Sequence, residues 1–507
     1  MSENLRNIRP AVFLLAGFVA LAGGCSRPGP SVPATSPSTK AEREEWHSLL
    51  LGGKPAGFMQ EIHRRSPEGN LVTWTRQRLI VRRGAEPVQM EAELEVEETL
   101  GGDILGFRLL QRLASENMVS EGKVRGDQME ISVTGSGEPR RIAVPFDRRA
   151  KGPRAIERLL LASLKQPGDS LSETTFFPEK NSCGRVTVVR GPEEEVPLPG
   201  GARRLVRRAS NFDILPGHEM NEWLDESGVI WKSATSLLGM TIETHRSSAE
   251  EILREKYASP PEVFYASSVR PDRPLRDPTT IQEAVYRFRL KSGDFKSRGI
   301  EGMFSGTGQT ILKEESPSAR IVRIAKVMPH AAVPRPVVAP KGEEAALAPN
   351  AFIQSDDPAI VELSAKAAGD RTDAFTAARE IERWVRKNVK FKDLRTPFAS
   401  AREVARRLEG DCTEHGVLLA ALARAAGIPA RVVSGLVYYQ GSFVGHLWTE
   451  VYIDRWVPLD GTRGYGGVGP DHIALSASPL AASSAADLFL DLAQVIGNLT
   501  IEILEER

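Results

Sequence analysis

The chain has 507 residues, with 66 basic and 66 acidic side chains and a formal net charge of +0. This balance does not favour nucleic acid as a partner, because chains that bind nucleic acid normally carry a basic excess. The apolar content of 41% is ordinary for a globular protein, and the length allows about three domains.

Residues 1–25 have the features of an export signal. Two arginines precede the apolar run Ala11–Leu21, which is too short to span a bilayer as a mature helix. The next four residues, Ala22–Cys25, resemble a bacterial lipoprotein signal, in which Cys25 becomes the acylated N-terminus and anchors the protein. We therefore expect a cell-envelope protein, lipid-anchored on the periplasmic side of a membrane. The outer membrane is favoured because Ser26 rather than aspartate follows the cysteine; simple secretion is the alternative.

Residues 26–41 are rich in Pro, Ser and Thr, which is typical of a flexible linker. The chain has three cysteines, Cys25, Cys183 and Cys412, too few for a disulfide framework. If Cys25 carries lipid, Cys183 and Cys412 remain. A disulfide between these two is the competing possibility, and it would silence any chemistry at Cys412.

Residues 42–258 are predicted to form a mainly-β domain. Apolar residues alternate over Val88–Val96 and Met129–Val133, as in half-buried strands, and Arg154–Leu164 is a predicted helix. The basic cluster Arg203–Arg208 is interpreted as a solvated face, like the acidic cluster before it. The scattered histidines of this region are interpreted as surface or packing residues: His47, His63, His218 and His245.

Residues 259–345 are predicted to form a smaller β domain that ends in an extended connector. Alternation at Tyr286–Leu290 and Ile321–Ala325 indicates strands, and the Pro-rich stretch Ala331–Pro340 indicates the connector.

Residues 346–507 contain the stretch with recognisable chemistry. A capping box of Ser400 and Glu403 predicts one short helix, and a second helix is expected from about Thr413 to Ala426. Cys412 lies where this second helix begins. The positive end of the helix dipole favours the thiolate, which is the nucleophilic form of cysteine.

A thiolate of this kind needs a proton partner, usually a histidine oriented by a carboxylate. Period-two alternation places His446 and Trp448 on one face of a strand, and a short turn leads to a second strand, Trp456–Leu459. Asp460 follows this second strand. If the two strands pair as a hairpin, Asp460 comes close to His446.

The segments Gly410–His415, Gly427–Arg431 and His446–Asp460 together resemble the core of the transglutaminase-like superfamily. The resemblance covers roughly Pro358 to Asp471. It implies a papain-like α+β fold in which Cys412 is the nucleophile, His446 the base and Asp460 the residue that orients the base. The chain departs from the usual His-Ala-Trp and Asp-Pro-Thr segments, but no side chain that does chemistry is changed.

The expected fold class is therefore α+β, with a mainly-β N-terminal region followed by a C-terminal transglutaminase-like domain. The expected function is acyl transfer on peptide or amide bonds through a thioester, with hydrolysis slightly favoured over cross-linking and a protein or peptide as substrate. The alternative is a non-catalytic envelope scaffold with an inactive domain.

No cofactor or metal is expected, and no calcium-loop pattern is present. A metal-site alternative would use Cys412, His415, His446 and Asp460 as ligands. Two tryptophans near these residues, Trp384 and Trp448, are interpreted as packing aromatics.

Overall fold

The computed structural model describes the chain from residue 41 onward, with short gaps. The described ranges are 41–83, 86–112, 117–135, 139–237, 239–255, 257, 259–263, 268–391, 399–463, 467–481 and 491–507. The predicted signal segment with Cys25, and nearly all of the predicted linker, lie outside them. None of the helices in these ranges combines the length and apolar character needed to cross a membrane.

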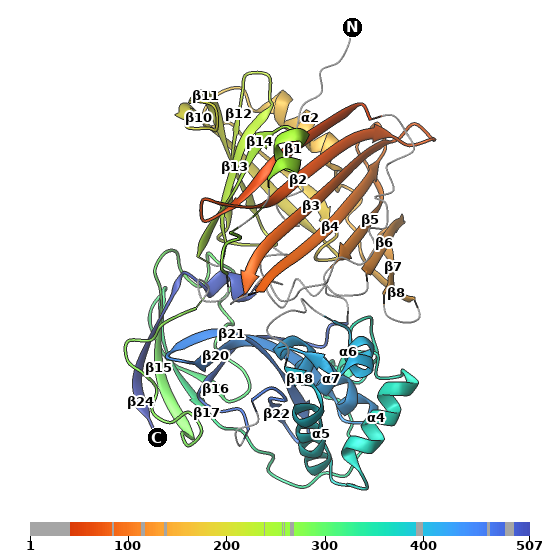
Figure 1. Ribbon diagram of the computed structural model, residues 1–507, viewed down its shortest axis with the longest axis vertical. Coiled ribbons are helices and arrows are strands. Elements are labelled where there is room, and N and C mark those ends of the chain that lie inside the picture. Colours follow the sequence, from red (N-terminus) through yellow and green to blue (C-terminus); the bar gives the residue numbers. More distant parts are fainter. Residues whose placement is uncertain are drawn as a thin grey trace.

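The N-terminal region forms one antiparallel sheet, which curls so that its β8 end comes into contact with β10 (Figure 1). The strand order is β8-β7-β6-β5-β4-β3-β2-β1-β14-β13-β12-β11-β10-β9, so nearly every strand pairs with its neighbours in sequence. The strands are β1 (Arg43–Leu51), β2 (Lys54–Arg65), β3 (Leu71–Arg83), β4 (Glu86–Glu98), β5 (Ile104–Arg112), β6 (Asn117–Arg125), β7 (Gln128–Thr134), β8 (Arg140–Pro145), β9 (Ser170–Phe177), β10 (Ser182–Val196), β11 (Arg203–Phe212), β12 (Glu219–Leu224), β13 (Ile230–Leu237) and β14 (Met240–Ser247).

Two helices accompany this sheet, α2 (Pro153–Ser163) and α3 (Ala249–Arg254). The predicted helix α2 is confirmed. The carboxylate of Glu98 on β4 accepts hydrogen bonds from the first backbone N–H groups of α2, at 2.9 Å for both Arg154 and Ala155. These groups have no partner within the helix, so Glu98 replaces a local cap and fixes α2 to the sheet.

The interpretation of Arg203–Arg208 as a solvated face is wrong for Arg208. This side chain is buried and donates to Glu222, at 2.6 Å from Nη2 to Oε2, in the facing register position of β12. A run of charges does not reveal which member meets a buried partner across the sheet. The four scattered histidines are all buried, as packing residues would be.

A second, smaller sheet has the order β16-β17-β15-β24. Its strands are β15 (Glu283–Leu290), β16 (Gln309–Ser316), β17 (Ala319–Ala325) and β24 (Leu499–Glu506). The last strand of the chain thus pairs with β15, which lies more than 200 residues earlier in sequence. This sheet packs against the sheet of the C-terminal unit, since the ring of Tyr286 on β15 meets that of Phe443 on β21 (Ser442–Tyr452) edge-on, with 6.0 Å between centroids.

The remaining residues form an α+β unit in which helices cover one side of a four-stranded sheet ordered β22-β21-β20-β23 (Figure 1). Its helices are η1 (Glu344–Ala346), α4 (Pro358–Ala368), α5 (Ala374–Asn388), α6 (Ala401–Arg407) and α7 (Cys412–Ala425). Its strands are β20 (Ala430–Tyr439), β21 (Ser442–Tyr452), β22 (Trp456–Leu459) and β23 (His472–Ser478), with the short parallel pair β18 (Lys390–Phe391) and β19 (Glu409–Gly410). Helix α7 is central: it contacts α4, α5, α6, β20 and β21.

The fold class predicted from the sequence is confirmed by this arrangement, a large β region followed by an α+β domain. From the sequence a helix is also expected at 485–496; its first half lies outside the described residues, and residues 491–495 are helical.

Candidate active site

Helix α7 begins at Cys412 because two acidic side chains close its first turn. The Asp411 carboxylate accepts from the backbone N–H of Thr413 at 3.0 Å, and the Glu414 carboxylate accepts from that of Asp411 at 2.9 Å. This is a capping box. At the shorter helix before it, Ser400 accepts from the backbone N–H of Glu403 at 3.4 Å, as the sequence predicted. Cys412 therefore occupies the first position of a firmly capped helix and is partly exposed.

Glycine allows this helix to lie directly against β21. A Cβ atom at Gly416 would lie 2.3 Å from Cδ2 of Leu447, so a larger residue would push the helix away. The hydroxyl of Thr449 also donates to the Gly416 carbonyl at 2.8 Å. The first turns of the cysteine helix are thus fixed to the strand that carries His446.

Asp460 lies close to His446, as the sequence predicted. The hairpin of β21 and β22 brings the two together, with 2.9 Å between His446 Nε2 and Asp460 Oδ2 and both residues buried. A carboxylate only accepts hydrogen bonds, so Nε2 carries the proton. This leaves Nδ1 of His446 as the nitrogen that can exchange a proton with a thiol.

Backbone groups hold Asp460 in place. Its other oxygen, Oδ1, accepts from the N–H of Thr462 at 2.8 Å and from that of Arg463 at 3.4 Å. Its own N–H donates to Glu382 of α5 at 2.9 Å. Burial opposes ionisation of Asp460, but the charge and hydrogen bond of His446, with those of His472, hold its pKa well below the usual range. Burial raises the pKa of Glu382 to about 7 against the opposing charge of Arg379.

The structure adds a residue that sequence reasoning missed. His472, the first residue of β23, places Nε2 3.2 Å from the same Asp460 oxygen and Nδ1 2.8 Å from Asp471 Oδ1. Burial disfavours its charged form, but Asp471 and Asp460 outweigh burial and raise the pKa of His472 to about 9. No spacing rule ties His472 to Cys412 or His446, and the resemblance to the superfamily rests on motifs that end at Asp460.

The metal-site alternative built on Cys412 and His415 is not supported. In the described parts of the chain, the one group of three or more candidate ligands whose donor atoms lie within 4.8 Å of one another is His446, Asp460 and His472. His415 instead directs Nδ1 at the Asp411 carbonyl, 2.6 Å away. Hydrogen bonds to carboxylates account for the position of both imidazoles in the group, so we assign no metal to it.

The two remaining sequence interpretations concern tryptophan and the second cysteine. Trp448 is buried beside both histidines, with ring centroids 6.1 Å from His446 and 5.3 Å from His472, and packs there as expected. Cys183 lies on β10 in the N-terminal sheet, where its sulfur accepts from the Asp147 N–H at 3.3 Å. It is not joined to Cys412, so the disulfide alternative does not hold in this structure.

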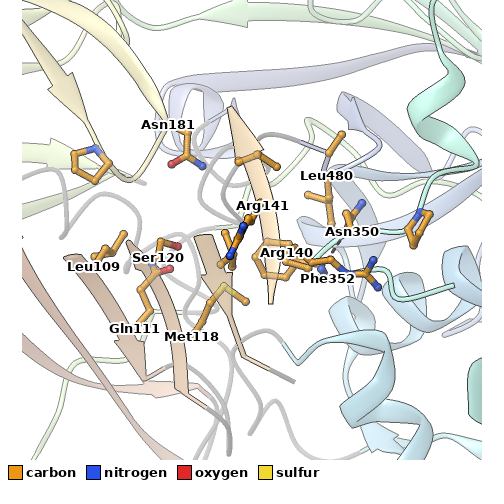
Figure 2. Close-up of a pocket in the computed structure, with 16 residues that line it drawn as sticks. Leu109, Gln111, Met118, Ser120, Arg140, Arg141, Asn181, Asn350, Phe352 and Leu480 are labelled. Atoms are coloured by element: carbon orange, nitrogen blue, oxygen red, sulfur yellow. Dashed lines mark hydrogen bonds between the residues drawn. The ribbon is translucent and has the colours of Figure 1, made fainter. Parts of the chain in front are cut away.

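A hollow away from the cysteine helix lies between the N-terminal sheet and the α+β unit (Figure 2). Strands β5 to β8 form one wall, and the segment around Phe352 together with Leu480 forms the other. Beside it, Arg140 forms an ion pair with Asp356, at 2.6 Å from Nη2 to Oδ1. None of Cys412, His446 and Asp460 lines this hollow.

Comparison with known families agrees with the geometry around Asp460. Residues 361–461 match the transglutaminase-like superfamily. The chain contains a transglutaminase-like domain. The match spans α4 to β22 and includes the three residues that the sequence singled out. This match supports a cysteine-dependent enzyme in general.

Solved structures show weaker similarity. A "putative cysteine protease" from Cytophaga hutchinsonii is 19% identical, with 45% of this chain and 86% of that chain covered and a TM-score of 0.29. A β-barrel-like protein of the domain of unknown function DUF1849, from Brucella abortus, is 13% identical over 40% of this chain and 95% of that chain, with a TM-score of 0.31. Among curated proteins, none matches this sequence.

Proposed function

We propose that the protein is a cysteine-dependent acyl-transfer enzyme that acts on peptide or amide bonds through a thioester at Cys412. The observation that carries this is the buried His446–Asp460 hydrogen bond on the strand against which the cysteine helix is packed. The match to the transglutaminase-like superfamily supports the same chemistry.

In the proposed reaction, the Cys412 thiolate attacks the carbonyl carbon, a C–S bond forms and the carbonyl oxygen becomes an oxyanion. In this proposal the backbone N–H of Cys412, at the start of α7, donates to the oxyanion and stabilises it. Collapse breaks the C–N bond, and the imidazolium of His446 gives its proton to the leaving amine. Asp460 keeps the imidazole in the required orientation.

Water or an amine then attacks the thioester. His446 removes the proton of the attacking group, and the C–S bond breaks to regenerate the thiolate beside the imidazolium. Attack by water yields an acid, whereas attack by an amine yields a new amide. Hydrolysis is the outcome we favour slightly, on the resemblance alone.

The decisive test is alkylation of the full chain by iodoacetamide across a pH series, followed by mass spectrometry. We expect Cys412 to react well below pH 7 and faster than Cys183, whose pKa is raised by burial. The advantage should be lost in His446→Ala. Casein hydrolysis then reports transfer of the acyl group to water, and dansylcadaverine incorporation reports its transfer to an amine. Cys412→Ala should abolish activity and the control Cys183→Ala should retain it. Activity that survives in Cys412→Ala would contradict the mechanism.

We also propose that the protein is anchored by lipid at Cys25 on the periplasmic side of the outer membrane, where its substrate would be an envelope protein or peptide. The support is the sequence of residues 1–25. Mass spectrometry of the mature N-terminus should show an acylated cysteine, and Cys25→Ser should release the protein from the membrane fraction. An unmodified mature N-terminus would favour simple secretion instead.

A further inference from the structure

One oxygen of Asp460 serves two histidines. Oδ2 lies 2.9 Å from Nε2 of His446 and 3.2 Å from Nε2 of His472. Because the oxygen of an ionised carboxylate only accepts, both Nε2 atoms carry protons. The two rings are neighbours, with 5.8 Å between their centroids. His472 is therefore in contact with the proposed machinery through Asp460.

The geometry favours the cationic form of His472. Its second nitrogen, Nδ1, lies 2.8 Å from Oδ1 of Asp471, so this nitrogen also faces an acceptor. A neutral imidazole has one N–H and could satisfy only one of the two carboxylates. His472 is buried, and a buried polar group without its partner is costly, so the doubly protonated form is favoured.

The second sheet holds this cation in place. The hydroxyl of Tyr286 on β15 donates to the carbonyl of Pro470 at 2.6 Å. The side chain of Gln309 on β16 bonds Ala474 twice, accepting from its N–H at 2.7 Å and donating to its carbonyl at 3.0 Å. The backbone on both sides of His472 is thus tied to a separate sheet, and this limits movement of the imidazole away from Asp460.

We propose that His472 is a positioning residue for the acyl transfer assigned to Cys412, His446 and Asp460. As a fixed cation it directs Oδ2 of Asp460 toward His446 and takes up part of that oxygen's negative charge. A less negative Asp460 holds the imidazolium of His446 less tightly, which eases proton transfer to the leaving amine. This role rests on the proposed function.

The electrostatic surroundings of His472 include groups from several elements. Asp460 and Arg463 follow β22, and Asp471 precedes β23. Three further groups come from strands and a helix packed nearby. These others are His446, Glu382 and Tyr286. His472 is the buried cation that bridges the two aspartates.

The test uses iodoacetamide alkylation of Cys412 in the full chain. The profile of rate against pH should show a plateau for the thiolate–imidazolium pair and an alkaline step at which this ion pair is lost. In His472→Gln, loss of the cation should move this step up by roughly one pH unit. In Asp471→Asn, His472 loses its counter-charge and becomes neutral, so the step should move the same way. The shift should be smaller, because one negative charge is lost as well.

His218→Gln is the matched control, because His218 is a buried histidine that directly precedes β12 and bonds only uncharged groups. It should leave the step unmoved. Rapid wild-type labelling with an unmoved step in both variants would overturn the role of His472 alone. Wild-type labelling of Cys412 no faster than that of Cys183 would instead overturn the proposed function, and this role with it.

If neither variant folds, nitrogen NMR of the histidine rings in the wild-type chain decides the question. An imidazole that stays doubly protonated up to about pH 9 supports the proposal. The absence of such an imidazole overturns it.

Discussion

At the scale of single residues, Asp460 is the point where the site is assembled. Its two oxygens accept from two imidazoles and two backbone N–H groups, while its own N–H is held by Glu382. The hydrogen bond that orients His446 therefore depends on an ionised carboxylate at this position. An amide of the same shape would keep the volume but remove both the charge and two acceptor directions.

We expect Asp460→Asn to reduce turnover by about three to four orders of magnitude, as when the orienting aspartate of a catalytic triad is replaced. The low-pH alkylation of Cys412 should fall with it, because the imidazolium loses its counter-charge. The measurement is the rate of iodoacetamide labelling at pH 6, with circular dichroism as a check on folding.

Asp370→Asn is the control for this change. Asp370 is an exposed aspartate of the same domain, at the turn after α4, and its replacement should leave labelling unchanged. If Asp460→Asn folds and still labels as fast as the wild type, Asp460 does not orient the base.

Sequence reasoning could find Cys412, His446 and Asp460 because each belongs to a local pattern: a helix start, an alternating strand and the end of a hairpin. It could not find His472. That residue reaches Asp460 because β23 pairs with β20, with Ala474 opposite Gly435, and this pairing follows from tertiary packing rather than from local propensity. Buried Arg208 was missed for the same reason, since its partner lies on the next strand.

At the scale of elements, the start of α7 links stability to reactivity. Asp411 caps the helix and Glu414 completes the box, so the position of Cys412 depends on both. Glu414 also accepts from the N–H of Ala399 at 2.8 Å, which ties the preceding loop to the same turn. The sequence predicted where this helix begins, but its capping box was not recognised.

We expect Asp411→Ala to destabilise the protein by about 1 kcal/mol through the lost cap. It should also slow the low-pH labelling of Cys412, because the first turn frays and the oriented N–H groups near the sulfur are lost. Thermal unfolding and iodoacetamide labelling measure the two effects.

Ser248→Ala is the control that separates the loss of stability from the loss of Cys412 reactivity. Ser248 caps α3 in the N-terminal region with a capping box of the same kind, so its loss should cost a similar free energy of unfolding without altering Cys412. Equal labelling in the two variants would mean that the cap of α7 does not contribute to reactivity.

At the scale of the whole molecule, the site depends on three separate parts of the chain. The α+β unit supplies Cys412, His446 and Asp460. The small sheet supplies Tyr286 and Gln309, which hold the segment carrying His472. The last strand of the chain completes that small sheet. The proposed active site is therefore assembled only when residues about 200 positions apart have paired.

Ile501 on β24 tests this dependence. It is buried and lies opposite Phe288 on β15, two residues from Tyr286. We expect Ile501→Ala to reduce the free energy of unfolding by about 2–5 kcal/mol, the usual cost of a large-to-small change in a packed core. The neighbouring Thr500 is exposed, and Thr500→Ala should cost well below about 1 kcal/mol.

If the small sheet positions His472, the alkaline step of Cys412 labelling should also move upward in Ile501→Ala at temperatures where the protein remains folded. A destabilised variant with an unchanged step would mean that the small sheet contributes stability to the molecule without adjusting the electrostatics of the site.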